Sequence, residues 1–214
     1  MAKKVIIIGS GWHAKVIIDI LSSAKDYELV GCTTKDSSIK KIMGIPILGN
    51  DSILPRIFVE GIKYAFIAIG DNRKREELSN HVIEIGFELI NAVSLYSYIS
   101  STAKLGKGVA IMPGAVINPD AIIEDSVIIN TGATIDHDCI IERSCHIAPG
   151  CNIAGNVRIG HGSFLGVGCN VIPKMTVGEW STIGAGAVVV NDLPGYSIAV
   201  GSPAKVIKKL QEEV

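Results

Sequence analysis

The chain has 214 residues and a formal net charge of -1, so its charge gives no reason to expect nucleic acid or an acidic membrane as a partner. Aromatic residues make up 5% of the chain and glycine occurs 23 times, a composition typical of a narrow solenoid with little room for rings. The first apolar run, Val5–Ile8, is too short for a signal peptide, and no stretch approaches a membrane span. We therefore expect a cytoplasmic protein.

The first ninety residues alternate strand patterns with helix patterns. The β-branched run at residues 4–8 predicts a buried parallel strand. Gly9–Ala14 then has the G-x-G-x-x-A spacing and leads into an apolar-periodic helix. Further strands are expected at residues 28–32 and 65–69, and a charged helix ends near Gly86. This order predicts a Rossmann-like α/β domain with a small parallel sheet covered on both faces.

The glycine turn suggests a ligand phosphate, because it lets the backbone approach closely and directs helix N–H groups at the anion. Dinucleotide binding also requires an acid at the end of the second strand. That place holds Cys32–Lys35, with no carboxylate before Asp36, and the unit lacks the second half of a dinucleotide fold. The pattern argues against NAD and favours one nucleotide or its diphosphate at the carboxyl ends of the strands.

Several side chains near this turn are candidate ligand contacts, each with a simpler alternative. His13 either binds a phosphate or sugar or is a partly exposed capping residue, and Trp12 either covers a base or packs under the sheet. Arg73 is a candidate for a phosphate, whereas Lys74 and Arg75 are interpreted as a solvated helix face. The candidate backbone and side-chain contacts at the two strand ends are Gly9, Gly11, Trp12, His13, Gly70, Asp71 and Arg73.

A six-residue repeat dominates residues 99–189. Every sixth residue is aliphatic, and a mostly small residue stands four places after each. This period fits neither an α-helix nor a hairpin array, but it fits a three-sided parallel β-helix with about 18 residues per coil. The repeating aliphatics are Ile99, Leu105, Ile111, Ile117, Ile123, Ile129, Ile135, Ile141, Ile147, Ile153, Ile159, Leu165, Val171, Val177, Ile183 and Val189.

Four of the five cysteines stand at the small position of the repeat: Cys139, Cys145, Cys151 and Cys169. A metal cluster or disulfides would be the functional interpretation. Because the spacing of these cysteines is that of the repeat itself, we expect small buried hydrophobic residues instead.

His137 is the candidate catalytic base, because Asp136 and Asp138 flank it. Its place in the hexad predicts a corner of the solenoid, pointing outward. A neighbouring carboxylate orients an imidazole and stabilises its protonated form. The residues about 18 places away, Pro119 and Gly155, are its expected stacking neighbours, and the glycine leaves a side for a substrate to approach. A lone surface histidine is the simpler alternative.

Two further histidines lie in the repeat. His146 is not stacked with His137 and is a candidate contact for an acyl donor, with the neighbouring subunit as a further option. His161, between Gly160 and Gly162, is expected to be a solvated corner residue. Three imidazoles can hold a catalytic zinc, but the closely spaced histidine pair of zinc-binding solenoids is not present, so we expect no metal.

Taken together, these motifs resemble the NeuD/PglD group of bacterial sugar acetyltransferases over essentially the whole chain. The resemblance implies a left-handed β-helix, a homotrimer with active sites at subunit interfaces, and acetyl-CoA as co-substrate. The motifs that carry it are Gly9–Lys15, Ile67–Arg73, Asn130–Cys139 and Val200–Lys205.

The resemblance also implies roles for particular residues. His137 would be the general base, and Asp138 would raise its basicity. His146 would contact acetyl-CoA, backbone groups near Gly155, Val167 and Ala185 would line the groove for the pantetheine arm, and Lys205 would meet the phosphates of the coenzyme.

Two departures from the family pattern concern the nucleotide. Trp12 stands where many members have glycine. Thr33 and Thr34 stand where several members have an acidic pair that can contact the base or sugar, so both threonines join the candidate substrate contacts. These departures leave the identity of the nucleotide open.

The function that the resemblance implies is acetyl-CoA-dependent N-acetylation of an amino group, at C4, on a nucleotide-linked amino-dideoxy sugar for glycan or polysaccharide biosynthesis. Two alternatives remain. One is O-acetylation of sialic acid or a related sugar, and the other is a non-catalytic trimeric scaffold that binds a nucleotide sugar.

The expected organisation follows the repeat. Residues 1–92 form the nucleotide-sugar-binding domain, residues 99–190 form the β-helix acetyltransferase domain, and residues 191–214 form a C-terminal loop and short helix.

Overall fold

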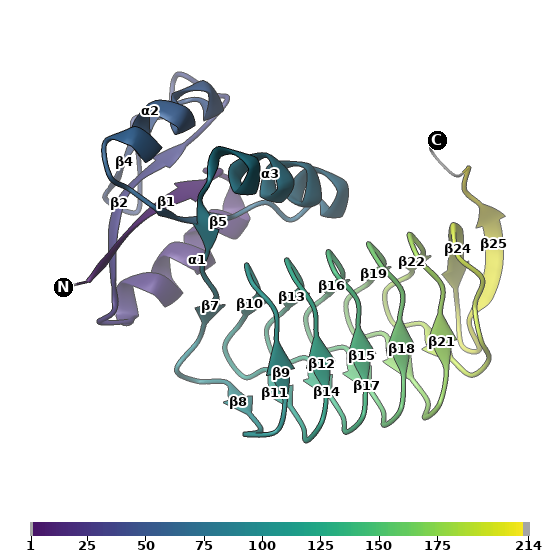
Figure 1. The fold of residues 1–214 in the computed structure, drawn as a ribbon. Coiled ribbons are helices and arrows are strands. Elements are labelled where there is room, and N and C mark those ends of the chain that lie inside the picture. The colour runs from purple at the N-terminus through teal and green to yellow at the C-terminus, as the bar shows by residue number, and fades with distance from the viewer. Residues whose placement is uncertain (1, 212–214) are drawn as a thin grey trace. The chain divides into compact units, whose positions relative to one another are not determined.

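The computed structural model describes residues 2–211, and the chain divides into two compact units between Leu95 and Tyr96. The first unit is an α/β domain and the second is a stack of short strands (Figure 1). No helix within residues 2–211 is long and apolar enough to cross a membrane.

The first unit is built on a six-stranded sheet. Its strands are β1 (Lys3–Ile8), β2 (Tyr27–Thr33), β3 (Lys41–Ile42), β4 (Ile45–Gly49), β5 (Tyr64–Ile67) and β6 (Glu88–Leu89). They lie in the order β3-β4-β2-β1-β5-β6, all pairings being parallel except that of β3 with β4. The apolar run of β1 is buried, as expected for a central parallel strand.

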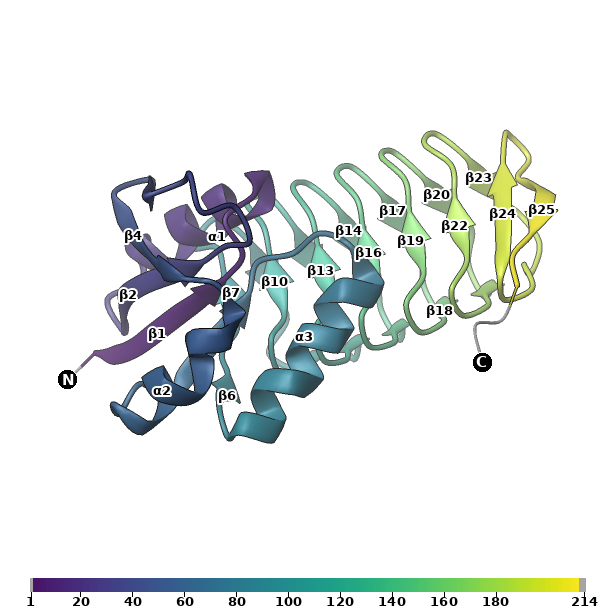
Figure 2. The same cartoon turned by 90° about the horizontal axis from the view of Figure 1, so that it is seen from above.

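Helices cover this sheet on both faces, as predicted (Figure 2). They are α1 (Trp12–Ser23), the 3₁₀ turn η1 (Asp51–Ile53), α2 (Leu54–Val59) and α3 (Asn72–Ile85). Ile6 and Ile8 of β1 form one core cluster with Leu54 of α2 and Leu78 of α3. Because side chains alternate along a strand, Val5 and Ile7 face the opposite side. η1 and α2 were not predicted, since they are too short to show a helical period.

The second unit stacks two-residue strands into three parallel faces that follow β7 (Ala92–Val93) in the chain. The β10 face contains β10 (Ala110–Ile111), β13 (Ile128–Ile129), β16 (His146–Ile147), β19 (Phe164–Leu165) and β22 (Thr182–Ile183). The β8 face contains β8 (Tyr98–Ile99), β11 (Val116–Ile117), β14 (Thr134–Ile135), β17 (Asn152–Ile153), β20 (Asn170–Val171) and β23 (Val188–Val189). The β9 face contains β9 (Lys104–Leu105), β12 (Ile122–Ile123), β15 (Ile140–Ile141), β18 (Arg158–Ile159) and β21 (Thr176–Val177).

The aliphatic residue of each six-residue repeat is the inward-facing residue of every one of these strands, as predicted. Ile135 pairs with Ile153, which pairs with Val171, so each coil repeats the one before it at the expected spacing. These inward side chains are buried along the stack. Ile99 and Leu105 are only half-buried, because they belong to the first coil.

The cysteines of the repeat are buried and free, which confirms their structural interpretation. The Cys145 thiol donates to the Gly160 carbonyl oxygen, and the Cys151 thiol donates to the Gly166 carbonyl oxygen, both at 3.1 Å. Burial raises the pKa of Cys169 to about 12, which keeps that thiol protonated and inert.

The expected C-terminal helix is wrong for the part of residues 191–214 that is described. β24 (Ser197–Val200) pairs in parallel with β22, and β25 (Lys205–Lys209) pairs antiparallel with β24. The last strand of the β10 face leaves backbone groups that need partners, and the extended C-terminal segment supplies them. Residues 212–214 of that prediction lie outside the described residues.

Candidate functional site

His137 lies at a corner of the solenoid between β14 and β15, as predicted. Its side chain is exposed. The next residue, Asp138, has φ +58°, and the corner residues one coil before and after, Asp120 and Asn156, both have φ +60°. Aspartate and asparagine tolerate this left-handed conformation better than other residues with a side chain. The repeated corner conformation therefore gives His137 a defined backbone position.

Two carboxylates hold the imidazole and its backbone. His137 Nδ1 lies 2.8 Å from Asp138 Oδ2, and the His137 backbone N–H donates to Asp136 Oδ1 at 2.8 Å. Asn118, one coil earlier, donates from Nδ2 to the same Asp136 oxygen at 3.1 Å. The hydrogen bond to Asp138 raises the pKa of His137 above its usual value, and the charge of Asp136 acts in the same direction. This arrangement leaves Nε2 as the atom that can take a proton.

Gly155 lies beneath the imidazole, but not as an opening for substrate. A Cβ placed on Gly155 would stand 2.6 Å from His137 Nε2 and 2.7 Å from Cε1. The imidazole itself therefore occupies the space that the missing side chain leaves, and the expected approach of a substrate from that side is wrong. The glycine is needed because the ring packs directly on its backbone.

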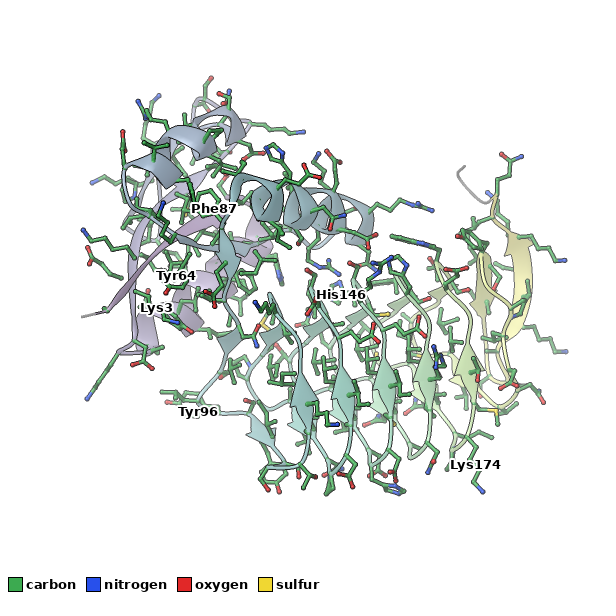
Figure 3. The ribbon with its side chains drawn as sticks, viewed as in Figure 1. Lys3, Tyr64, Phe87, Tyr96, His146 and Lys174 are labelled. Carbon is green, nitrogen blue, oxygen red and sulfur yellow. The ribbon has the colours of Figure 1, made fainter. Side chains whose placement is uncertain are left out.

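His146 projects outward from β16 on the β10 face (Figure 3). Its Nε2 lies 3.1 Å from Asn130 Nδ2, and the Asn130 side-chain oxygen accepts from the Thr131 backbone N–H at 2.8 Å. Because this leaves the Asn130 amide as donor, His146 Nε2 is the acceptor and Nδ1 carries the proton. The Phe164 ring packs against the imidazole in a T-shaped arrangement, with the two ring centroids 5.2 Å apart. Sequence reasoning gave Asn130 no role, although it stands in the quoted histidine motif.

One chain does not bring His137 and His146 together. His137 is at the corner between the β8 and β9 faces, whereas His146 lies on the β10 face, the side of the triangular coil opposite that corner. Val167 and Ala185 stack on a different corner, where the Gly186 N–H donates to the Val167 carbonyl oxygen. Lys205 lies on the exposed strand β25.

His161 lies at a corner between β18 and β19, as predicted, but it is half-buried rather than solvated. Its ring centroid lies 4.8 Å from that of Trp180, which stands about one coil later, and its backbone N–H donates to the Glu142 carboxylate at 2.8 Å. Gly162 leaves the space that the Trp180 ring fills. This contact gives His161 a packing role.

The first unit has a pocket of about 300 Å³ at the carboxyl ends of its strands. Four predicted contacts line it: Gly9, Gly11, Thr33 and Thr34. It is also lined by Ser10, Lys35, Asp51, Ile69 and Lys74, none of which was a predicted contact. Gly9 has φ +110°, and a Cβ there would lie 3.0 Å from the Ala68 carbonyl oxygen, so this position requires glycine. The predicted turn therefore does open onto a cavity.

The other predicted contacts of this unit do not line that pocket. Trp12 is 89% exposed, so it does not pack under the sheet. Asp71 caps α3, its carboxylate accepting from the Lys74 backbone N–H at 2.8 Å. Gly70 uses its carbonyl oxygen to accept from the Arg75 guanidinium, and Arg73 is exposed on the first turn of α3.

His13 and Arg75 differ from their simpler interpretations. Arg75 is buried rather than solvated, and its guanidinium donates to the Ile69 and Gly70 carbonyl oxygens and to Asn72 Oδ1. His13 Nε2 is buried and has no hydrogen-bond partner among the described residues. Burial, followed by the charge of Arg75, lowers the pKa of His13 to about 4. His13 is therefore a neutral imidazole at physiological pH.

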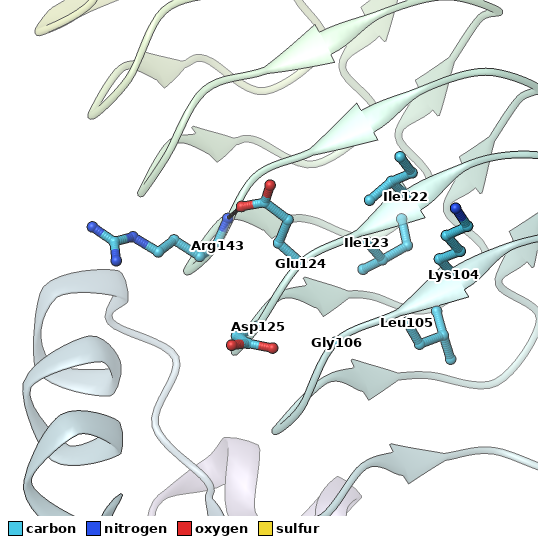
Figure 4. Close-up of a pocket in the computed structure, with 8 residues that line it drawn as sticks. All are labelled: Lys104, Leu105, Gly106, Ile122, Ile123, Glu124, Asp125 and Arg143. Carbon is cyan, nitrogen blue, oxygen red and sulfur yellow. Dashed lines mark hydrogen bonds between the residues drawn. The ribbon is translucent and has the colours of Figure 1, made fainter.

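A further hollow of about 290 Å³ lies along β9 and β12 (Figure 4). Its acids are already occupied: Glu124 accepts from the Arg143 backbone N–H at 2.9 Å, and Asp125 accepts from the Lys107 backbone N–H at 2.7 Å. None of the predicted site residues lines it. Within residues 2–211, no group of three or more His, Cys, Asp and Glu side chains is placed to hold a metal ion.

Comparisons with known proteins match both units. The PglD N-terminal domain family matches residues 4–82, and the bacterial transferase hexapeptide family matches residues 102–137. A structure of perosamine N-acetyltransferase from Caulobacter crescentus, in complex with CoA and GDP-perosamine, is 41% identical. The alignment covers 98% of this chain and 99% of that chain, with a TM-score of 0.94.

Two further relatives differ in extent. The acetyltransferase domain of PglB from Neisseria gonorrhoeae, in complex with acetyl coenzyme A, is 32% identical over 97% of this chain and 100% of that chain, with a TM-score of 0.92. A curated relative, the uncharacterized protein L142 of Acanthamoeba polyphaga mimivirus, is 33% identical over 121 residues. That match covers 56% of this chain, and the chain spans about a quarter of the length of that relative, 24%.

The second unit is a hexapeptide β-helix whose histidine is flanked by acids, and the first is an α/β domain whose glycine turn opens onto a pocket. This combination defines an acyltransferase of the hexapeptide class. The chain belongs to the NeuD/PglD family of bacterial sugar acetyltransferases, and the predicted left-handed β-helix is confirmed.

The pKa of His137 should depend on Asp138. In Asp138→Asn the pKa of His137 falls, because the hydrogen bond that contributes most to raising it loses its charge. A raised pKa keeps the proton on the imidazole to higher pH, so in the variant the imidazole becomes neutral at lower pH. NMR titration of the His137 ring protons measures this. Asp120→Asn, at the same corner one coil earlier, is the control and should leave the His137 titration unchanged. An unshifted titration in Asp138→Asn would contradict the inference that Asp138 raises the pKa of His137.

Proposed function

We propose that this protein transfers the acetyl group of acetyl-CoA to the amino group of a nucleotide-linked amino-dideoxy sugar. The observation that carries the proposal is the exposed His137, whose Nδ1 is held by Asp138 and whose Nε2 is left to act on a substrate. The 41% identical Caulobacter enzyme, bound to CoA and GDP-perosamine, supports a sugar amine as acceptor and makes a GDP-linked sugar the first substrate to test.

The reaction needs one base and one proton path. The sugar amine attacks the thioester carbonyl carbon, so that a C–N bond forms and the C–S bond breaks. His137 Nε2 takes the proton from the amine and returns it to the departing thiolate, while a backbone amide of a neighbouring coil stabilises the developing oxyanion. A pKa raised by Asp138 strengthens His137 as a base for the amine.

The acetyl donor is proposed to bind along the solenoid. Val167 and Ala185 are exposed and stack at one corner, and we propose that a pantetheine arm lies along it. His146, whose imidazole is half-buried on the β10 face, is proposed to contact the coenzyme. Lys205 carries a positive charge on the exposed β25 for its phosphates.

We also propose that the working form is a homotrimer, with each active site shared by two copies. The support is the placement of His137 and His146 on opposite sides of the coil, so that one site can use both only if different copies supply them.

His137→Ala should lower turnover by about 100-fold or more, because it removes the general base, while the assembly stays intact.

Gly155→Ala should also lower turnover by about 100-fold, because the added methyl collides with the His137 ring and displaces Nε2. The assay follows thiol release from acetyl-CoA with GDP-perosamine as acceptor.

The double variant is the control for this pair. Adding Gly155→Ala to His137→Ala should cost nothing more, since the ring that the methyl meets is gone. Near wild-type turnover in His137→Ala would refute the base assignment.

A substrate comparison separates the two acetyltransferase functions. Acetylation of free sialic acid, with no transfer to amino-sugar nucleotides carrying UDP, GDP, dTDP or CMP, would favour the O-acetyltransferase alternative.

Subunit mixing tests the shared site. His137→Ala and His146→Ala chains, each impaired alone, should recover activity when they are co-expressed. Random assembly gives about a quarter of the sites both intact histidines if the two come from different copies. If one copy supplied both, no site would be restored, and activity would stay at the level of the separate variants.

A further inference from the structure

The end of β2 lacks the acid that commonly holds a ribose in nucleotide-binding α/β folds. Thr33 stands there instead, fully buried, and its hydroxyl donates to Asp51 Oδ1 at 2.6 Å. Asp51 opens η1, directly after β4 and Asn50, and β4 is the neighbour of β2 in the sheet. The fold therefore brings a carboxylate from a later element to the place where the second strand has none.

Local structure does not require this carboxylate. The η1 turn is capped by Asn50, whose side-chain oxygen accepts from the Ser52 backbone N–H at 3.0 Å. Asp51 Oδ1 accepts the Thr33 hydroxyl, and within residues 2–211 no hydrogen bond or ion pair is formed by Oδ2. One oxygen fixes the carboxylate, and the other stays available in the pocket.

The surroundings of Asp51 match the order of groups in a nucleoside diphosphate. Asp51 lines the same pocket as the Gly9–Gly11 turn, where backbone amides and Lys35 suit phosphates. A second pocket of about 410 Å³ shares Thr34 and Lys35 with the first and includes Asn50, the residue before Asp51. Its apolar lining, Ile39, Ile47 and Leu48, suits the faces of a base. Asp51 thus stands where a ribose would link the two.

We propose that Asp51 binds the ribose hydroxyls of the nucleotide sugar and selects ribonucleotides over 2′-deoxyribonucleotides. This inference rests on the proposed function, because it assumes that the pocket holds the nucleotide part of the substrate. Asp51 is a specificity residue that touches the nucleoside and not the reacting amine. It favours a sugar linked to a ribonucleotide such as GDP, UDP or CMP over one linked to dTDP, whose 2′ position has no hydroxyl.

The experiment is a binding cycle between Asp51 and the 2′-hydroxyl. Isothermal titration calorimetry compares GDP with dGDP, and UDP with dUDP, on the full-length wild type, Asp51→Asn and Asp51→Ala. In the wild type the preferred ribonucleotide should bind about 10-fold or more tightly than its deoxy form, as for a hydrogen bond to a charged group. In Asp51→Ala the two should bind equally, and Asp51→Asn should lie between, since an amide oxygen still accepts.

Asp36→Asn is the matched control, since Asp36 is an exposed carboxylate near the same strand end that accepts from Ser38 and does not line the pocket. It should keep the wild-type preference. If Asp51→Ala does not fold, as judged by circular dichroism, the isosteric Asp51→Asn carries the test with the same direction of change.

Three results would overturn the proposal. The first is that the wild type binds dGDP and dUDP as tightly as GDP and UDP. The second is that the preference for the ribonucleotide survives in both Asp51 variants, and the third is that none of these nucleotides binds. A loss of GDP-over-IDP preference in Asp51→Ala, with the 2′-hydroxyl preference unchanged, would place the carboxylate on a base instead. Because no acetyl-CoA is present, the cycle is independent of acetyl transfer. A protein that fails to acetylate any sugar amine but shows the cycle would refute only the proposed function.

Discussion

The regular stacking of the coils is the constraint on which the second unit depends. Once each backbone strand pairs with the strand one coil away, every side chain meets the residue at the same place in the next coil. The histidine corner is a product of this rule: Asn118 reaches Asp136, and the ring of His137 lies on Gly155. Chemistry enters a solenoid of this kind when one coil carries a reactive side chain and the next provides the space for it.

The repeat explains why so much of this unit was predictable. Inward positions, buried cysteines and the corner of His137 all follow from counting in sixes, because stacking turns sequence spacing directly into spatial contact. Features outside the period were missed or misjudged. The burial of Arg75 depends on the Ile69 and Gly70 carbonyl oxygens, which follow β5 and accept from its guanidinium. The strand β25 forms because the edge of β24 provides backbone groups for it to pair with. Asp51 reaches the end of β2 through sheet order, which no local pattern encodes.

The two units position their candidate site residues in different ways. The first presents a pocket at the carboxyl ends of parallel strands, where loops vary freely and the ligand can change without disturbing the sheet. The second holds its groups on a rigid stack, where a corner residue has little freedom to move. The imidazole of His13 belongs to the first unit, and its lowered pKa keeps it uncharged over the physiological range.

The outermost strand, β25, has a consequence for the behaviour of the protein in solution. A stack of parallel coils ends in an open row of backbone donors and acceptors, which can template the addition of another stack and so the growth of a fibre. On the β10 face this row is covered by an antiparallel strand whose exposed surface carries Lys205, Lys208 and Lys209. Like charges on that edge repel a second copy approaching end to end, so the same lysine-rich strand that finishes the fold also limits its self-association.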